Sequence, residues 1–297
     1  MPLPLPMDDR EPVRCPSGLY VVATPIGNLE DITLRAIRVL NGVDLIAAED
    51  TRHTTRLLFH YGIRTPLISC HEHNERHRTP ELIDKIRSGG SVALVSDAGT
   101  PSVSDPGYRL VSTAVESGLT VFPIPGVSAA VTGLCASGLP TDAFVFLGFT
   151  PKKKGKRMDL LASLAAEPRT LIFYESPRRV SVFLDEIRAV MGDRHAVLAR
   201  EMTKIHEEFI RGTLSEILIV LADRPEVKGE CTLMVDGAAA SDSVPTDDLA
   251  DALRDALAQP GAHLSGLSKA FAHRYQLPRK TVYEMALAIQ KETGAPD

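Results

Sequence analysis

Short apolar runs alternate with helical patterns along the first half of the chain. Runs rich in Val, Leu, Ile and Ala predict strands over residues 19–23, 43–48, 66–70, 91–96 and 119–124. Apolar residues at helical spacing predict helices over residues 34–40, 56–60, 82–86 and 110–115. Strands separated by helices of this length favour a mainly parallel sheet with helices on both faces.

The pattern changes after Phe149. Residues 150–157 are rich in Lys and have no apolar period, so they predict a linker or an exposed loop. A second α/β set follows, with strands predicted over 170–174, 196–200 and 231–235 and helices over 180–190 and 214–221. A break at 237–248, rich in Ala, Ser and Asp, precedes three helical patterns at 249–257, 267–275 and 281–289.

These patterns predict two α/β domains with a small helical C-terminal tail. The expected divisions are a flexible leader (1–17), a first α/β domain (18–149), a second α/β domain (150–237), a linker (238–248) and the tail (249–297). A helix-turn-helix-like turn in the tail predicts either nucleic-acid binding or packing on the body or on a partner. The second alternative is favoured by the tail's apolar residues Leu267, Ala270, Phe271, Tyr275 and Leu277.

Composition narrows the classes of protein. The apolar fraction of 44% is enough for a sizeable core, and a net charge of −5 argues against a uniformly cationic nucleic-acid binder. No apolar run reaches the length that spans a bilayer, and the leader lacks the features of a secretion signal. The 4 cysteines lie far apart, which fits reduced thiols better than disulfides or a zinc knuckle. We therefore expect a cytoplasmic protein without a membrane segment.

Three loops rich in Gly, Pro, Ser and Ala follow predicted strands, at residues 23–29, 96–107 and 124–130. Ligands of open α/β sheets bind just beyond the carboxyl ends of the strands, and small residues let the backbone approach a ligand. None of the loops has the spacing of a dinucleotide or triphosphate loop. Together they predict a small-molecule pocket, with Asp97 as an acceptor. Asp105, before Pro106, is a candidate N-cap of the next helix.

Longer motifs, which occur in the same order along the chain, make the sequence similar to a known protein family. The chain resembles the bacterial 16S rRNA (cytidine-2′-O)-methyltransferase family in segments 24–33, 48–52, 96–107, 125–129, 174–179, 200–204, 206–208 and 228–230. The resemblance implies the tetrapyrrole methylase-like type of fold, with S-adenosylmethionine held between two α/β domains. It also implies a homodimer, and 16S rRNA or the small ribosomal subunit as partner. A tetrapyrrole or another small molecule remains the alternative substrate.

The same resemblance places the cofactor on the strand-end loops and on one residue of the second domain. The implied contacts are Pro25, Gly27, Asp97, Ala98, Gly99, Val103, Ser104, Ser128, Ala129 and Gly229. The reaction would move a methyl group from a sulfonium to a ribose 2′-oxygen in an in-line displacement. Alignment supplies about 7–11 kcal/mol in favourable cases, and a general base adds about 10²–10⁴-fold.

Several residues are candidates for the proton acceptor. Lys204 is the first choice, provided that burial or a cationic neighbour such as Arg200 lowers its pKa. Its alternative role is an ion pair with Glu201 or Glu207. Asp50 is the second choice, and the more common role of an Asp in its position is to cap the following helix. The remaining carboxylate candidates are Glu49, Asp97, Glu207 and Glu208.

Local basic clusters fit an RNA partner despite the acidic total. Phosphate contacts give salt-dependent affinity, and the target cytidine has to be presented to the site. The expected substrate-binding residues are Arg52, Arg56, His71, His73, Lys153, Arg178 and Arg179. The His-rich segment 70–77 is also a candidate metal site by its composition. Its spacing is not the H-E-x-x-H pattern, so no metal is expected. The alternative for the Lys run is a solvated loop.

Overall fold

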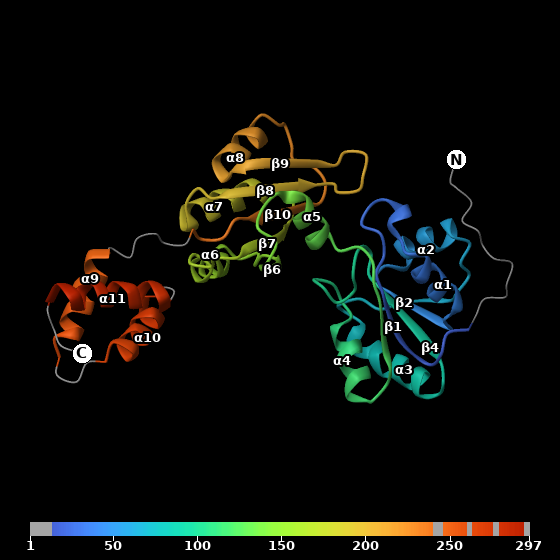
Figure 1. Cartoon of the computed structure of the whole chain (residues 1–297). Helices are drawn as coiled ribbons and strands as arrows, with labels where there is room; N and C mark the ends of the chain where they lie inside the picture. Colours follow the sequence, from blue (N-terminus) through green and yellow to red (C-terminus); the bar gives the residue numbers. More distant parts are fainter. Residues whose placement is uncertain (1–13, 240–245, 260–262, 276–278, 294–297) are drawn as a thin grey trace. The chain divides into compact units, whose positions relative to one another are not determined.

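The computed structural model describes residues 14–239, 246–259, 263–275 and 279–293. The chain forms two compact units, Met1–Ala238 and Ala239–Asp297. The first contains two five-stranded sheets and the second contains three helices (Figure 1). The predicted class, two α/β parts with a small helical tail, is confirmed.

The first sheet is parallel, with strand order β3-β2-β4-β1-β5. Its strands are β1 (Gly18–Val22), β2 (Leu45–Ala48), β3 (Leu67–Ser69), β4 (Ser91–Val95) and β5 (Val121–Ile124). Its helical elements are η1 (Leu29–Asp31), α1 (Leu34–Gly42), α2 (Thr51–His60), α3 (Glu75–Arg87) and α4 (Tyr108–Glu116). Parallel strands buried on both faces read as apolar runs, which explains why the sequence predicted these strands closely.

Alternate residues of these strands pack on opposite faces of the sheet. Ile46 and Ala48 join a cluster with Leu40 of α1 and Leu57 of α2. On the opposite face, Ala47 and Val92 belong to a cluster with the apolar residues of α3 and α4, namely Leu82, Ile83, Ile86, Leu110 and Ala114. Helix α1 begins where the Thr33 hydroxyl accepts the N–H of Ala36 at 3.0 Å. This sandwich fixes the strand ends that carry the loops.

The second sheet is mixed, with strand order β6-β7-β10-β8-β9. Strands β6 and β7 form its parallel pair, and the other neighbouring strands are antiparallel. Its strands are β6 (Phe144–Phe149), β7 (Thr170–Glu175), β8 (His195–Arg200), β9 (Glu208–Thr213) and β10 (Cys231–Val235). Its helices are α5 (Ala129–Ser137), α6 (Lys154–Ser163), α7 (Val180–Met191) and α8 (Leu214–Ala222). Cys231 pairs with Glu175 and with Arg200, so the start of β10 lies between the ends of β7 and β8.

The expectation of a linker or loop at 150–157 is wrong for its second half. Residues from Lys154 onward form α6, and Arg157 is only 7% exposed. Its guanidinium forms an ion pair with Glu186 of α7, with Nε and Oε2 2.5 Å apart. The apolar residues of α6 begin only at Met158, so the first turn carries no hydrophobic period. Strand β6 and helix α5 are also absent from the elements predicted by the sequence.

The C-terminal unit consists of α9 (Thr246–Leu257), α10 (Leu264–Tyr275) and α11 (Arg279–Thr293). These helices share their own core of Leu249, Leu253, Val282, Ala286 and Ile289. Phe271 and Tyr275 pack against that core, so the tail buries part of its apolar surface internally. Leu277, which was expected to be buried, lies outside the described residues. Within the described ranges, no helix is long and apolar enough to cross a bilayer.

The structure describes only part of the expected leader and linker. Of the expected leader, residues 14–17 are described: the N–H of Cys15 donates to Gly42 O at 2.9 Å, and the Ser17 hydroxyl donates to Ile86 O at 2.9 Å. Residues 1–13 of the leader and 240–245 of the expected linker lie outside the described residues.

Candidate functional site

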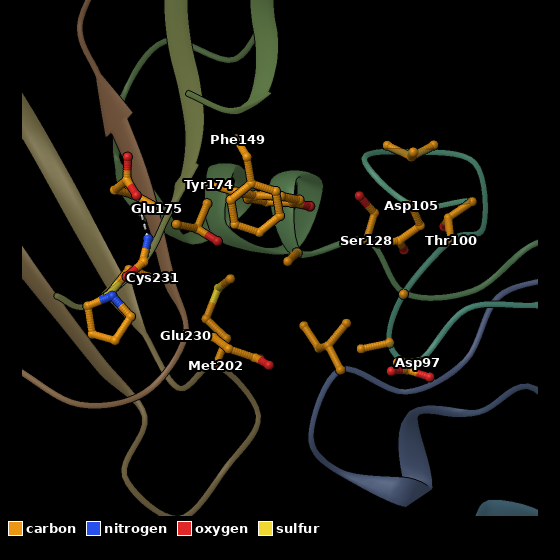
Figure 2. Close-up of a pocket in the computed structure, with 18 of the residues that line it drawn as sticks. Asp97, Thr100, Asp105, Ser128, Phe149, Tyr174, Glu175, Met202, Glu230 and Cys231 are labelled. Atoms are coloured by element: carbon orange, nitrogen blue, oxygen red, sulfur yellow. Dashed lines mark hydrogen bonds between the residues drawn. The ribbon is translucent and has the colours of Figure 1, made fainter. Parts of the chain in front are cut away.

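A cavity of about 320 Å³ lies at the carboxyl ends of the first sheet's strands. Its size is at the lower end of the range typical of small-molecule sites. One wall comes from strand-end loops of the first sheet: Ile26, Glu49, Asp97, Ala98, Gly99, Thr100, Val103, Asp105, Ser128 and Ala129. The other comes from the second sheet: Phe149, Tyr174, Glu175, Ser176, Pro177, Met202, Glu230, Cys231 and Thr232. Figure 2 shows side chains from both walls directed toward one space.

The small residues of the loops let the loops bond directly to one another. Thr24 and Gly99 exchange two backbone hydrogen bonds of 2.9 and 3.0 Å. The Thr100 hydroxyl donates to Val127 O at 3.1 Å, which ties the second loop to the third. A Cβ on Gly126 would lie 2.8 Å from the Ala23 Cβ, so only glycine fits there. The loops therefore form one rigid rim.

The loop from Gly99 to Gly107 has an unusual backbone. Ser102 and Ser104 have φ of 68° and 67°, in the left-handed region that non-glycine residues avoid. Such conformations concentrate at functional sites. Ser104 does not line the cavity but contacts β6, because a Cβ on Gly148 would lie 2.5 Å from the Ser104 Oγ.

The expectation that Asp105 caps the next helix is wrong. Helix α4 has Gly107 at its N-cap position and no side-chain cap bond. The N–H of Leu110, in its first turn, donates instead to Glu75 Oε1 of α3 at 3.2 Å. Asp105 instead lines the cavity, a position that the sequence did not indicate.

Three carboxylates, Glu49, Asp97 and Asp105, lie on the same wall of the cavity. The N–H of Asp50 donates to Asp97 Oδ1 at 3.0 Å, and the N–H of Asp97 points to Glu49 Oε2 at 3.4 Å. Burial raises the pKa of Glu49. Burial, followed by the charge of Glu49, raises the pKa of Asp105 to about 6. A wall of this kind favours a cationic ligand, whose charge would relieve the repulsion among the carboxylates.

The opposite wall is aromatic. Tyr174 makes edge contacts with Phe146 and Phe149, with ring centroids 5.0 and 5.6 Å apart. Its hydroxyl oxygen accepts the N–H of Ala130 at 3.2 Å, which joins β7 to the first turn of α5. Burial raises the pKa of Tyr174, so it remains a neutral phenol near pH 7. The sequence does not indicate Tyr174 or Phe149 as site residues, although Tyr174 begins segment 174–179, one of those that resemble the methyltransferase family.

The expected cofactor residues divide into three groups. Six line the cavity: Asp97, Ala98, Gly99, Val103, Ser128 and Ala129. Pro25 and Gly27 line an adjoining cavity of about 360 Å³, which shares Asp97 and Ala98 with the first. Ser104 and Gly229 line neither. Gly229 instead has φ of 86° and packs against Glu201, whose side chain would overlap an added Cβ.

Lys204 does not meet the condition set for a proton acceptor. Its Nζ lies 2.9 Å from Glu201 Oε1 and 3.0 Å from Glu230 Oε2. Burial alone would lower the pKa of Lys204, but the bonds and charges of the two carboxylates outweigh it and raise that pKa. The ammonium form is therefore stabilised, and the alternative ion pair with Glu201 is the one present.

Asp50 is the N-cap of α2, the structural role that the sequence favoured. Its side chain accepts the N–H of Arg52 at 2.8 Å and forms a bidentate pair with the Arg52 guanidinium. The side-chain bond from Arg52 is the main cause that holds the pKa of Asp50 well below its usual range. A carboxylate so stabilised is a weak base.

The expected substrate-binding residues lie on several elements. Arg56 of α2 lines the adjoining cavity, whereas Arg52 is paired with Asp50. The rings of His71 and His73 are 6.0 Å apart, and Nδ1 of His71 is buried without a hydrogen-bond partner. Arg179 contacts the buried Glu175, with Nη2 and Oε1 2.5 Å apart. Lys153, at the N-cap of α6, and Arg178, before α7, are exposed.

No three His, Cys, Asp or Glu side chains in the described part of the chain are placed to hold a metal ion. This applies also to the segment 70–77, where a metal site had been considered. The cavity itself places a carboxylate wall opposite an aromatic wall, an arrangement that suits an organic ligand with a positive charge.

Comparison with known proteins agrees with the fold. Residues 18–218 match the family of Tetrapyrrole (Corrin/Porphyrin) Methylases, which defines the class of protein. Among solved structures, a uroporphyrin-III-C-methyltransferase from Thermus thermophilus superposes with a TM-score of 0.54 at 20% identity, over 74% of this chain and 94% of that one. This likeness shows the fold.

Closer relatives define the family. The ribosomal RNA small subunit methyltransferase I of Synechocystis sp. is 47% identical over 92% of this chain and 99% of its own length. That of Halalkalibacterium halodurans is 53% identical over 74% of this chain and 75% of its own length. The chain therefore belongs to the ribosomal RNA small subunit methyltransferase I family, as the resemblance of its motifs predicted.

Proposed function

We propose that the protein methylates the 2′-oxygen of a cytidine ribose in 16S ribosomal RNA, with S-adenosylmethionine as methyl donor. The observation that carries the proposal is the cavity between the carboxylate and aromatic walls, in a chain similar over most of its length to ribosomal RNA small subunit methyltransferase I. We propose a cofactor domain that starts at residue 18 and a second α/β domain that ends at residue 237. The boundary between them lies before β6 and not at the expected residue 149, because β6 pairs with β7 of the second sheet.

The residues present fit such a donor. A sulfonium carries a positive charge, and Glu49, Asp97 and Asp105 supply negative charge on one wall. Ala98, Gly99 and Ala129 leave room on the same wall, where longer side chains would fill the cavity. When bound, the donor supplies an electrophilic methyl group. We propose that Pro25 and Gly27 border it from the adjoining cavity, and that Ser104 and Gly229 shape the site from behind.

The residues of this chain act mainly by positioning. The rim is fixed by the Thr24–Gly99 and Thr100–Val127 bonds, so the carboxylates need little rearrangement when a ligand binds. Such preorganisation is the larger contribution to a displacement reaction, because alignment alone is worth about 7–11 kcal/mol. Tyr174 and Phe149 exclude water from the other side of the cavity.

Glu49 is the proposed proton acceptor among the candidates that the sequence offers. It lines the cavity, and burial raises its pKa toward the range in which a carboxylate is an effective base. Asp50 is committed to Arg52, and Lys204 is held as an ammonium. We propose that Lys204 instead attracts a phosphate near the target ribose, from its position in the wall of the adjoining cavity.

The proposed RNA contacts are Arg52, Arg56, His71, His73, Lys153, Arg178 and Arg179. Arg56 is the nearest of them to the site, since it shares a cavity with Asp97 and Lys204. We propose the small ribosomal subunit as the physiological partner, a homodimer as the functional assembly and the cytoplasm as the location, since a ribosomal RNA substrate is found there.

The proposal is tested by transfer of a labelled methyl group from S-adenosylmethionine to ribosomal RNA. We expect incorporation into 16S rRNA that is lost with excess S-adenosylhomocysteine. Incorporation only into a tetrapyrrole, offered in parallel, would support the alternative substrate class. Loss of transfer with a chelator would point to a metal-dependent reaction instead.

A further inference from the structure

A wide groove borders Lys204 next to the adjoining cavity. Its volume is about 1000 Å³, and it is lined by residues of segment 27–37, by His60 and Tyr61, and by the loop that joins β8 to β9. The groove shares Gly27 and Lys204 with the adjoining cavity, which in turn shares Asp97 and Ala98 with the main cavity. A chain lying in the groove would therefore pass the entrance of the proposed methyl-transfer site.

Ile205 stands at the edge of this groove with its side chain almost fully in solvent. The residue is 97% exposed, the highest value among the exposed large apolar residues of the described chain. It directly follows Lys204. Single exposed apolar residues are common on protein surfaces, so exposure alone would mean little, but the loop that carries this residue is tightly held.

Three hydrogen bonds fix that loop. Thr203 donates its N–H to Glu207 Oε2 at 2.6 Å, and its hydroxyl accepts the N–H of Asn28 at 3.0 Å. The N–H of Lys204 donates to Glu201 O at 3.0 Å. Glu201 and Thr203 have φ of 47° and 67°, which non-glycine residues adopt only where the surroundings impose it. Ile205 is thus presented by a rigid loop.

The rest of the groove suits nucleotide bases. Tyr61 lines it and is oriented by a 2.6 Å hydrogen bond from its hydroxyl to Leu29 O. The ring of His60 meets that of Tyr61 edge-on, with centroids 4.8 Å apart. Leu34, 69% exposed, adds aliphatic surface. Bases released from a stack bind to aromatic and apolar side chains of this kind.

We propose that Ile205 is a wedge that separates the target cytidine from a neighbouring base, and that the groove holds the displaced neighbour. An apolar side chain inserted at a base step unstacks that step, and a nucleotide freed from its stack can enter an enclosed site. This role rests on the proposed function. It makes Ile205 a positioning residue, because the side chain acts on the RNA's conformation and not on the reacting atoms.

The test uses an RNA hairpin that contains the target cytidine, not yet methylated, with 2-aminopurine as its neighbour. The fluorescence of 2-aminopurine rises when this base leaves the stack. Wild-type protein should give a several-fold rise on saturation. Ile205→Ala should still bind the hairpin, as measured by fluorescence anisotropy, but should lose most of the rise in 2-aminopurine fluorescence. Ile205→Leu should restore that rise. Ile219→Ala is the matched control, because Ile219 lies on α8 and is 65% exposed.

Three results would overturn the inference: no rise with the wild type, an unchanged rise with Ile205→Ala, or a change of oligomeric state in that variant on size exclusion. The last would make Ile205 part of an interface between copies of the chain. Methyl transfer by the wild type is measured separately. If transfer occurs without unstacking, only the wedge fails; if no transfer to RNA occurs, the proposed function fails.

Discussion

The backbone N–H of Asp50 donates to the Asp97 carboxylate at 3.0 Å, which joins the end of β2 to the end of β4 at the wall of the cavity. Asp97 is thereby oriented by the backbone rather than by a cation, and its charge remains available to a ligand. The relationship explains why two segments far apart in sequence act as one wall, and it leads to the first prediction.

Asp97→Ala is expected to weaken binding of S-adenosylmethionine by roughly 10–100-fold, since hydrogen bonds to charged groups contribute about 1.5–3 kcal/mol. Isothermal titration calorimetry measures the effect. Asp159→Ala, which removes an exposed carboxylate on α6, should leave the affinity unchanged. Equal affinity of the Asp97 variant and the wild type would place the donor elsewhere.

Asp105→Asn is expected to stabilise the protein at pH 7 while weakening donor binding. The pKa of Asp105 is raised to about 6 in the folded state, so between about pH 4 and pH 6 the folded state binds more protons than the unfolded state. The contribution of Asp105 to the free energy of unfolding therefore falls as the pH rises through that window. The gain for the variant at pH 7 is of the order of 1–2 kcal/mol after allowance for partial exposure.

Urea unfolding of the Asp105 variant and the wild type at pH 4.5, 6 and 7.5 measures this difference. It should grow with pH and level off above about 7. A variant less stable than the wild type at pH 7.5 would show that the Asp105 carboxylate is not strained by burial.

Replacing Lys152, Lys153 and Lys154 together by Ala is expected to raise KM for RNA and to flatten its salt dependence. Each lost phosphate contact removes about 0.7–0.9 from the slope of log affinity against log salt. A triple variant of Arg38, Arg64 and Lys85, all exposed, removes the same charge elsewhere and should change the slope less. Equal slopes for the two triple variants would exclude the Lys segment from the RNA contact.

Arg157→Ala is expected to cost about 3–5 kcal/mol, because it leaves the Glu186 carboxylate buried without a partner. Both side chains are nearly buried, at 9% and 8% exposure. Arg188→Ala, which breaks the exposed pair with Asp185, should cost less than about 1 kcal/mol. Chemical denaturation compares the two, and similar costs would contradict the buried pair.

Arg157 also shows where sequence reasoning failed. The run from Lys152 to Arg157 looks uniformly solvated, because nothing in the sequence indicates that Glu186 lies beside its last member. For Lys204 the sequence indicated Glu201, three residues away, but the second carboxylate partner, Glu230, follows only from the pairing of β8 with β10. The Asp105 cap failed because Glu75, from another helix, supplies the capping oxygen.

Features that depend on local pattern were predictable. The strands of the first sheet and their small-residue loops could be identified because buried parallel strands are continuous apolar runs. Six of the expected cofactor residues line the cavity because strand ends of one sheet meet at one edge. The aromatic wall was missed because β6 was not predicted and Tyr174 reaches the cavity only through the packing of α5 on the second sheet.

The central claim is that the cavity holds a methyl donor beside an RNA ribose. The most direct test is mass-spectrometric mapping of ribose methylation in 16S rRNA from cells that lack the protein, complemented by the wild type or by Asp97→Ala. We predict one 2′-O-methylcytidine that disappears without the protein, returns with the wild type and is reduced with the variant. An identical methylation map in all of these cells would contradict the account.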